Sequence, residues 1–319
     1  MLKKLLVKKL LFLSLFLLGY YQATAQDYKS DFEKMYQKCT HTRIDSVHRL
    51  IVTFLRNYEV SFIRKKEKIQ TPERFYKFCN EFKARCKQNN QKELLRRLQI
   101  IEVIDTQKHN VVAAIVAEAK ILTLYDDFVQ MKDYSAGLSC LLELGLIQGY
   151  YNNNLQAIKV LFFAEKFAKK YNLSKDIALQ SILRGIGYYL WEFDIPALSI
   201  EYFKKSLQTG YTDYRDSLVI LNGIGINYQK INDFKQSNSY FEEASRLALR
   251  NKNTLFNAII EGNMAVTLFK TGNLTKAYQY ALQDKNISLH ENIWINAVGA
   301  MYWLIQIELK QNNFSHAKI

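Results

Sequence analysis

The segment from Leu221 to Arg250 constrains the fold more than any other part of the sequence. Its apolar and small residues recur at helical spacing on both sides of Ile231-Asn232-Asp233. Gly225 lies on the apolar face of the first half and Ala244 on that of the second, so two antiparallel helices can approach closely there. The segment therefore predicts a helical hairpin that turns at Asn232. The two faces consist of Leu221, Ile224, Gly225 and Tyr228, and of Phe234, Ser237, Phe241 and Ala244.

The same features recur along the chain at a nearly constant distance. Gly225 follows Gly187 at the same spacing at which Phe241 follows Phe203. Paired turn residues recur with a 40-residue period, namely Asn232-Asp233, Gly272-Asn273 and Asn312-Asn313. A fixed period of this size predicts a stack of similar two-helix units.

The hairpin resembles a tetratricopeptide (TPR) repeat. That family places a large residue, Leu-Gly and Tyr on helix A, and Ala, an aromatic residue and Ala on helix B. The resemblance covers Leu141 to Ile319, extends more weakly over Gln91 to Gln130, and reaches Gln26 to Asn90 only as helical hairpins. The period here exceeds the ~34 residues of the family, which implies longer helices or longer loops. The resemblance implies an all-α, right-handed helical-hairpin solenoid that acts by binding and has no chemistry of its own.

Three residues depart from the family pattern. Ser199 and Ser237 occupy the usual Ala position of helix B, and Asp284 stands where Ala244 lies in the best repeat. The aspartate leaves the register of the later unit open.

The composition and the scarcity of helix-breaking residues support long helices throughout. The chain of 319 residues is 49% hydrophobic and has only 2 prolines and 12 glycines, which favours helices over a β-sandwich. We expect a signal peptide at 1–25, N-terminal helical hairpins at 26–90, and TPR-like repeats at 91–319 with the last one incomplete. Expected helices outside the best hairpin are 41–59, 71–88, 92–105, 111–130, 141–151, 155–171, 182–191 and 196–208.

The N-terminal segment from Met1 to Ala25 predicts export. Lysines precede an apolar run from Leu10 to Leu18, and Ala23-Thr24-Ala25 forms a small-x-small cleavage site before Gln26. The run is short for a membrane span of about 20 residues, so an uncleaved anchor is the alternative. We therefore expect an exported protein, periplasmic or of the cell envelope. Association with a membrane would require an uncleaved N-terminus or a further C-terminal part.

The charge does not by itself indicate nucleic acid. The formal charge is +14, and removal of four signal-peptide lysines leaves +10 (14 − 4). Because an exported protein does not meet nucleic acid in the cytoplasm, we expect no nucleic-acid partner.

No pattern in the chain predicts catalysis or a cofactor. The Gly-x-Gly pairs at Gly185-Gly187 and Gly223-Gly225 lie within helical patterns, where a phosphate-binding loop would need to follow a strand. His41, Asp45 and His48 would share a helix face and could bind zinc, but they match no metalloprotease spacing. An exported metal-dependent hydrolase thus rests on this face alone, and metal analysis would test it. We expect no enzyme activity, metal or cofactor.

The cysteines leave two possibilities. An exported chain allows a disulfide from Cys39 to Cys79 or Cys86. Alternatively Cys39, Cys79, Cys86 and Cys140 are buried free thiols in helix contacts.

The resemblance also implies where a ligand binds. In TPR proteins, helix-A residues on the concave face contact a peptide or partner protein. The matching residues here are Arg184, Tyr188, Trp191, Asn222, Gln229 and Lys230, with Lys270, Tyr302 and Gln306 in the later units. Tyr188 and Trp191 serve equally well as packing between repeats.

Two functions fit this surface. The first is a protein–protein interaction scaffold of the cell envelope, and its mixture of basic, amide and aromatic groups suits a peptide of acidic character. The second is the extracytoplasmic sensor part of a membrane-spanning signalling or transcriptional regulator.

The segment from Ile293 to Leu309 is the most apolar helix A. We expect Asn312-Asn313 to form its hairpin turn, with Phe314 and Ala317 beginning the next helix B. We also expect Ile293, Trp294, Met301 or Trp303 to be partly exposed, because a solenoid needs a terminal cap.

Overall fold

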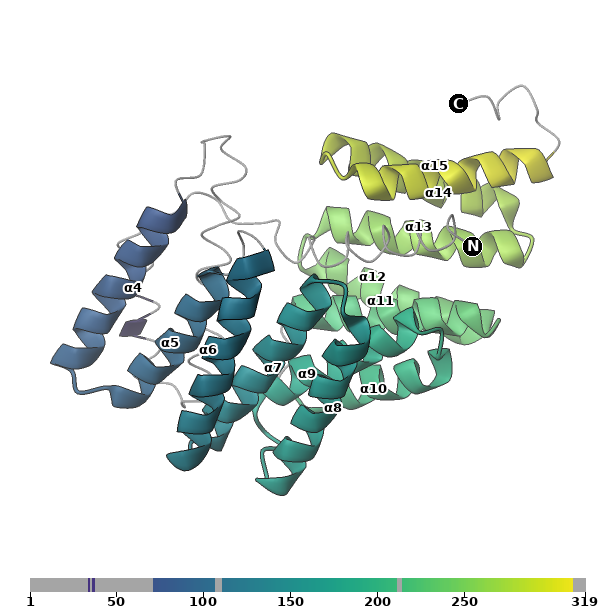
Figure 1. Ribbon diagram of the computed structural model, residues 1–319. Coiled ribbons are helices and arrows are strands. Elements are labelled where there is room, and N and C mark those ends of the chain that lie inside the picture. Colours follow the sequence, from purple (N-terminus) through teal and green to yellow (C-terminus); the bar gives the residue numbers. More distant parts are fainter. Residues whose placement is uncertain (1–33, 35, 38–70, 107–110, 211–213, 312–319) are drawn as a thin grey trace. The chain divides into compact units, whose positions relative to one another are not determined.

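A computed structural model describes residues 34, 36–37, 71–106, 111–210 and 214–311 (Figure 1). Within these ranges the regular structure is α-helical and no strand occurs, which confirms the predicted all-α class. The signal peptide at 1–25, the predicted helix at 41–59 and the predicted turn at 312–313 lie outside the described residues. So does the His41/Asp45/His48 face.

The described residues fall into two compact units, which divide within α9 (Ile177–Glu192) between Tyr189 and Leu190. From the sequence we expected a continuous array from residue 91 onward, because no linker composition interrupts it. The division falls inside a helix, where no composition change could indicate it.

The first unit contains five helices that pack in sequence order, followed by most of α9. They are α4 (Thr71–Gln88), α5 (Lys92–Thr106), α6 (Val111–Gln130), α7 (Tyr134–Tyr150) and α8 (Asn154–Lys170). Each contacts the next along the chain, as helical hairpins do. Large apolar side chains fill the space between α5, α6 and α7, among them Ile100, Ile121, Phe128 and Leu144.

The second unit confirms the 40-residue period. It contains α10 (Pro196–Gln208), α11 (Tyr214–Lys230), α12 (Phe234–Arg250), α13 (Thr254–Lys270), α14 (Leu274–His290) and α15 (Trp294–Lys310). The helices α11, α13 and α15 have 17 residues each and start at positions 214, 254 and 294. The helices α12 and α14 have the same length and start at positions 234 and 274. We call α11, α13 and α15 the A helices, and α12 and α14 the B helices.

The hairpin turns explain why these bounds repeat. Asn232 and Gly272 have positive φ angles of 60° and 88°, a conformation that Asn tolerates and Gly adopts freely. The next residue caps helix B, because the side chains of Asp233 and Asn273 accept the backbone N–H of Gln236 and Lys276. The predicted hairpin turn at Asn232 is thus confirmed.

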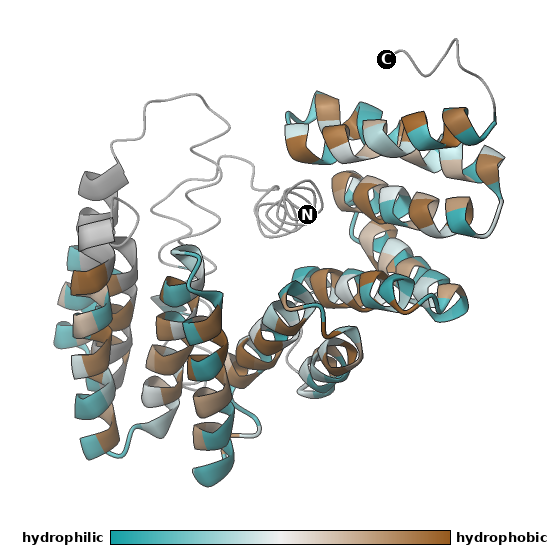
Figure 2. Ribbon diagram, turned by 45° about the vertical axis from the view of Figure 1, so that its right-hand side comes forward, coloured by the Kyte–Doolittle hydropathy of each residue, from teal (hydrophilic) through white to brown (hydrophobic). Residues whose placement is uncertain are grey.

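The apolar faces of the helices meet one another, as the hydropathy colouring shows (Figure 2). Gly225 lies against the ring of Phe241 on α12, and a Cβ at position 225 would stand 2.5 Å from Phe241 Cε1. The close approach predicted at Gly225 is therefore present, with Phe241 rather than Ala244 as the neighbour. Ala244 is itself fully buried.

Two helices begin earlier than the hydrophobic pattern predicts. We expected one to start at Leu141 and another at Ile182, but α7 starts at Tyr134 and α9 starts at Ile177. Asp133 caps α7 by accepting the N–H of Ala136, and Tyr134 stacks on Tyr171 with ring centroids 3.8 Å apart. The first turn of α7 is held by a cap and a tertiary contact, which apolar periodicity does not reveal.

The two cysteines that can be described are buried free thiols, Cys86 and Cys140. A Cys39–Cys86 disulfide is therefore not formed, whereas a Cys39–Cys79 pairing lies outside the described residues. Burial raises the pKa of the Cys86 thiol to about 12, so this thiol is not reactive.

Candidate functional site

Each A helix of the second unit ends in a lysine. Lys230, Lys270 and Lys310 are the last residues of α11, α13 and α15, and they repeat with the 40-residue period of these helices. A cation is favourable there because the helix dipole places partial negative charge at the C-terminus. Lys230 and Lys270 were predicted to contact a ligand. In the structure the three lysines have surroundings that differ from one another.

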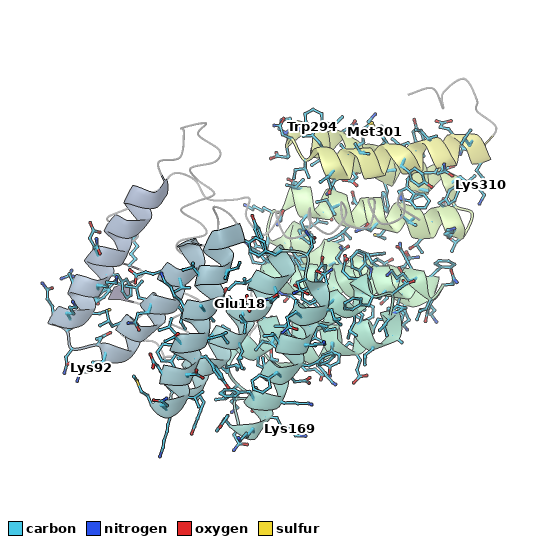
Figure 3. The ribbon with its side chains drawn as sticks, in the orientation of Figure 1. Lys92, Glu118, Lys169, Trp294, Met301 and Lys310 are labelled. Carbon is cyan, nitrogen blue, oxygen red and sulfur yellow. The ribbon has the colours of Figure 1, made fainter. Side chains whose placement is uncertain are left out.

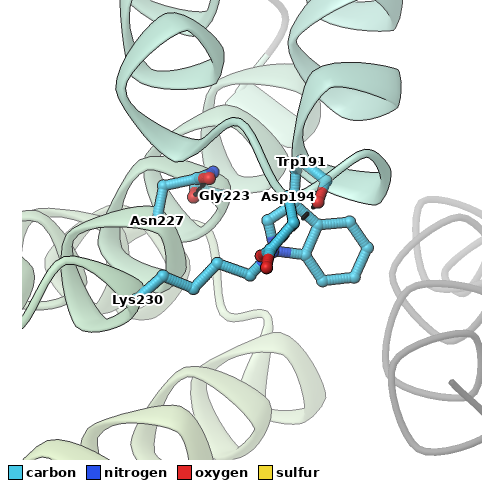
Figure 4. A network of polar contacts seen from close by, with 5 residues as sticks. All are labelled: Trp191, Asp194, Gly223, Asn227 and Lys230. Atoms are coloured by element: carbon cyan, nitrogen blue, oxygen red, sulfur yellow. Dashed lines mark hydrogen bonds and ion pairs between the residues drawn. The ribbon is translucent and has the colours of Figure 1, made fainter. Parts of the chain in front are cut away.

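Lys230 is bonded to the C-terminal end of α9 and to the turn that follows it (Figure 4). Its Nζ donates to the Trp191 carbonyl at 2.9 Å and forms an ion pair with Asp194 at 2.9 Å. The ammonium also lies 4.8 Å from the centroid of the Trp191 ring, a cation–π distance. The Trp191 side chain is buried, and only 17% of the Lys230 side chain is exposed. Trp191 and Lys230, both predicted to contact a ligand, therefore join α9 to α11.

Asn222 and Gln229 join α11 to α13. Asn222 is fully buried and its Oδ1 accepts a hydrogen bond from Asn263 Nδ2 at 2.9 Å. Gln229 Nε2 donates to the Asn263 carbonyl at 2.6 Å and to Thr267 Oγ1 at 2.7 Å. Both amides thus hold the next repeat in register.

Lys310 repeats the arrangement of Lys230 two repeats further on. Its Nζ donates to the Phe269 carbonyl at 3.3 Å and lies 4.5 Å from the centroid of the Phe269 ring. Phe269 packs against Trp303 with centroids 5.6 Å apart, and Trp303 meets Tyr302 edge to face at 5.3 Å. A continuous row of three aromatic rings therefore runs from α13 across α15, with Lys310 at its α13 end.

Lys270 differs from the other two lysines. It is exposed, and no described residue accepts a hydrogen bond or forms an ion pair with its ammonium group. The lysine-to-aromatic spacings of 39 and 41 residues lead from Lys270 to Ile231 and Gln229. Ile231 is 44% exposed and Gln229 is engaged with α13, so neither places an aromatic ring under Lys270.

Lys270 follows Phe269 in α13, and Phe269 contacts Trp303 and Lys310 of α15. Tyr302 is 49% exposed, whereas Trp303 and Gln306 are half-buried. We call Lys270, Tyr302, Trp303, Gln306 and Lys310 the α13–α15 surface. Neither of its lysines is paired with a described carboxylate, so it presents two positive charges beside aromatic rings. Such a surface can bind an acidic group and an apolar side chain next to it.

The remaining two predicted residues lie on α9 in the first unit. Arg184 and Tyr188 are half-buried, and Tyr188 packs edge to face on Tyr189 at 5.0 Å. The hydroxyl of Tyr189 in turn occupies the space beside Gly149 on α7. Tyr188 is thus part of helix packing within the first unit.

The prediction from sequence missed Lys310, Phe269 and Trp303. The lysine could have been found from the 40-residue period that it shares with Lys230 and Lys270. The aromatic pair could not, because only the packing of α15 on α13 shows that Phe269 and Trp303 meet.

Two further properties of the described residues bear on other functions. They contain no helix long and apolar enough to span a bilayer. Nor do they hold a group of three or more His, Cys, Asp or Glu side chains arranged to bind a metal ion.

Comparison with known proteins identifies the fold. No protein-family model and no curated sequence matches the chain. A signal transduction ATPase with numerous domains (STAND) from Pyrococcus horikoshii, which has a tetratricopeptide repeat sensor, is 16% identical with a TM-score of 0.55; the match covers 91% of this chain and 44% of that one. The apo quorum sensor NprR from B. thuringiensis is 14% identical with a TM-score of 0.53, covering 91% and 73%.

A Rap protein complexed with competence and sporulation factor is 14% identical with a TM-score of 0.52, and the match covers 92% of this chain and 74% of that one. Identities this low establish the fold alone. The chain therefore has a TPR-like helical-hairpin repeat fold, as its sequence predicted.

Proposed function

We propose that this protein is a non-enzymatic interaction scaffold of the cell envelope that binds an acidic peptide segment on the α13–α15 surface. The observation that carries the proposal is the contrast among the three periodic lysines. Lys230 and Lys310 lie over aromatic rings of α9 and α13, whereas Lys270 has no described hydrogen-bond or ion-pair partner. Lys230 is mostly buried and paired with Asp194, so the exposed charges left for a ligand are those of Lys270 and Lys310.

The chemistry of the surface favours a peptide over a small molecule. Tyr302 and Trp303 offer apolar area, Gln306 offers an amide, and two lysines offer charge. Aromatic anchors beside basic groups are typical of peptide recognition by α-helical surfaces. The TPR-like fold is consistent with a protein or peptide partner.

A binding measurement with a defined probe tests the proposal. A fluorescein-labelled 12-residue peptide rich in Glu and containing one Trp is titrated with the purified chain, and a Lys-rich peptide of equal length serves as the comparison. We expect the acidic peptide to bind, and Lys270→Glu to weaken binding by about tenfold, equivalent to about 1.4 kcal/mol. Binding should also weaken as salt increases, because the lysines are at the surface.

Lys235→Glu is the matched control, since Lys235 is an exposed lysine on α12 and changes the net charge equally. It should leave the affinity unchanged. Equal losses for Lys235→Glu and Lys270→Glu would attribute binding to net charge and overturn the proposal. Absence of any difference between the acidic and basic peptides would overturn it as well.

A second candidate function is the extracytoplasmic sensor part of a membrane-spanning regulator. Two of the similar structures are described as sensors, the STAND protein and NprR. The decisive observation is genomic: a membrane helix and an output domain, encoded in the same reading frame or the next one, would favour the sensor. Their absence from both would favour the free scaffold.

A further inference from the structure

A buried acid stands at the centre of the α13–α14 hairpin. Asp284 on α14 is 6% exposed, and it faces Gly262 on α13. Any side chain at position 262 would collide with the Asp284 carboxylate. The glycine therefore makes room for the carboxylate, and the pair is built as a unit.

Two separate sets of hydrogen bonds lie in this part of the unit, one within α14 and one between α12 and α13. Ser288 Oγ donates to Asp284 Oδ1 at 2.8 Å within α14. On α13, Asn257 Nδ2 donates to Glu261 Oε1 at 3.0 Å. Ser245 of α12 donates to Asn257 Oδ1 at 2.6 Å. The second oxygen of Glu261, Oε2, is buried and has no hydrogen-bond partner among the described residues.

The preceding repeat shows that the fold does not require these polar groups. By the 40-residue register, Asp284 corresponds to Ala244, Ser288 to Ala248 and Glu261 to Leu221. All three counterparts are buried apolar residues. The α13–α14 hairpin therefore places a buried carboxyl group, Asp284, and a half-buried one, Glu261, where the preceding repeat has buried apolar residues. Their desolvation is costly, and protonation relieves that cost.

The start of α15 holds a further buried polar side chain. Asn296 is 2% exposed, and neither polar atom of its side chain has a described partner. The backbone N–H of Ile293 donates to the Ser288 carbonyl at 2.7 Å, as Asn253 donates to Ala248 at the equivalent turn.

We propose that the α13–α14 hairpin forms a proton-operated element, in which a proton held by Asp284 tightens the packing of α14 on α13, the helix that carries Lys270 of the α13–α15 surface together with Phe269. Acidification would then strengthen the packing of this layer, and deprotonation would loosen it. The consequence for ligand binding rests on the proposed function, whereas the effect on stability does not.

The charges around Asp284 determine the direction of the effect. Burial is the larger cause that raises its pKa, the charge of Glu261 adds to it, and the hydrogen bond from Ser288 opposes both, leaving a pKa of about 7. Burial likewise raises the pKa of Glu261, against the hydrogen bond from Asn257. The titratable group of α13 whose charge acts on Asp284 is Glu261, and α14 contributes the neutral Ser288. No described cation forms an ion pair with Asp284.

A folded-state pKa above the ordinary value of 3.8 means that the folded protein retains a proton that the unfolded chain has lost. The contribution of Asp284 to folding stability is therefore fully present below pH 3.8. It falls as the pH rises toward about 7, and it stays low at higher pH. The protein would thus lose packing strength across the pH range in which envelopes and growth media vary.

Urea unfolding of the purified chain at a series of pH values tests the stability part. We expect the midpoint urea concentration of the wild type to fall from pH 5 to pH 7.5 and to level off above it. In Asp284→Asn, which keeps the shape without the charge, this fall should be lost. In Glu261→Gln it should shift to lower pH, because the neighbouring negative charge is gone.

Glu243→Gln is the matched control, since Glu243 is exposed on α12, and it should retain the wild-type profile. Should Asp284→Asn fail to fold, Asp284→Ala introduces the residue of the preceding repeat and should flatten the profile in the same way. An unaltered pH profile in a folded Asp284 variant would overturn the proposal.

The binding part uses the Glu-rich peptide described above. We expect its affinity for the wild type to be several-fold higher at pH 6 than at pH 8, and this difference to be absent in Asp284→Asn. The peptide itself stays ionised over this range. If the peptide binds neither protein while the urea profiles behave as expected, the proposed ligand is wrong and the proton-operated element stands.

Discussion

At Gly225 the main chain of α11 lies directly against the ring of Phe241. We expect Gly225→Leu to destabilise the protein by about 1–3 kcal/mol or more, because a larger side chain must push α11 and α12 apart. Thermal melting measures the effect. Gly299 is the control, since a Cβ there meets no atom within 4 Å.

Gly299→Ala should leave the melting temperature unchanged or raise it. The reason is that alanine stabilises a helix by about 0.5–1 kcal/mol relative to glycine. A Gly225→Leu protein that melts like the wild type would contradict the close contact between α11 and α12.

Lys230 and Lys270 allow a second comparison at the scale of single residues. Because the sequence predicts Lys230 to lie on the concave surface, we expected Lys230→Ala to change the free energy of unfolding by no more than about ±0.5 kcal/mol. The structure changes this expectation, because Lys230 contacts Trp191 and Asp194 while being mostly buried. Loss of the cation–π contact and of the bond to the carbonyl should now cost about 1 kcal/mol.

Lys270→Ala, at the equivalent position, should change stability by no more than about ±0.5 kcal/mol. Chemical unfolding of both variants measures the difference. Equal stabilities would show that the Trp191 contact contributes nothing.

At the scale of the element, α15 exposes an apolar face, whereas the corresponding face is buried in α11 and α13. Val298 is 54% exposed, whereas its counterparts in the two preceding A helices, Leu218 and Ala258, are fully buried. Trp294 is 63% exposed on the same helix (Figure 3), which confirms its predicted exposure, and Met301 and Trp303 are half-buried. The exposed face of α15 is therefore an apolar patch of the kind that binds other molecules.

We expect the purified chain to bind a hydrophobic fluorescent dye through this face. The double variant Trp294→Ser/Val298→Ser should lower the dye fluorescence several-fold, because it removes the centre of the patch. Leu155→Ser is the control, since Leu155 is 58% exposed on α8, and it should change the signal little. The same fluorescence from both variants would assign the dye site to another part of the protein.

At the scale of the whole molecule, the destination of the chain remains a prediction from the segment Met1 to Ala25. We expect N-terminal sequencing of the protein from cell envelopes to begin at Gln26, because Ala23-x-Ala25 offers the cleavage site. Replacing Ala25 by Arg should block cleavage and leave the precursor intact, whereas replacing Gln26 by Glu should not. Intact Met1 on a soluble cytoplasmic protein would contradict export.

The sequence by itself determined the helical class, the hairpin turn at Asn232 and the 40-residue period. These follow from local causes that the order of residues carries: helical spacing of apolar side chains, turn residues that accept positive φ, and capping side chains. The bounds 111–130 and 196–208 were predicted to the residue for the same reason.

Only the tertiary structure decided which polar groups serve packing and which remain for a partner. Lys230 and Lys270 occupy identical positions in their helices, yet Trp191 lies under one and no described aromatic ring lies under the other. Likewise Asp284 reads in sequence as a departure from the repeat, and its burial appears only where Gly262 faces it across the hairpin. Such differences arise from contacts between residues of different helices, whose geometry the packing of whole helices sets.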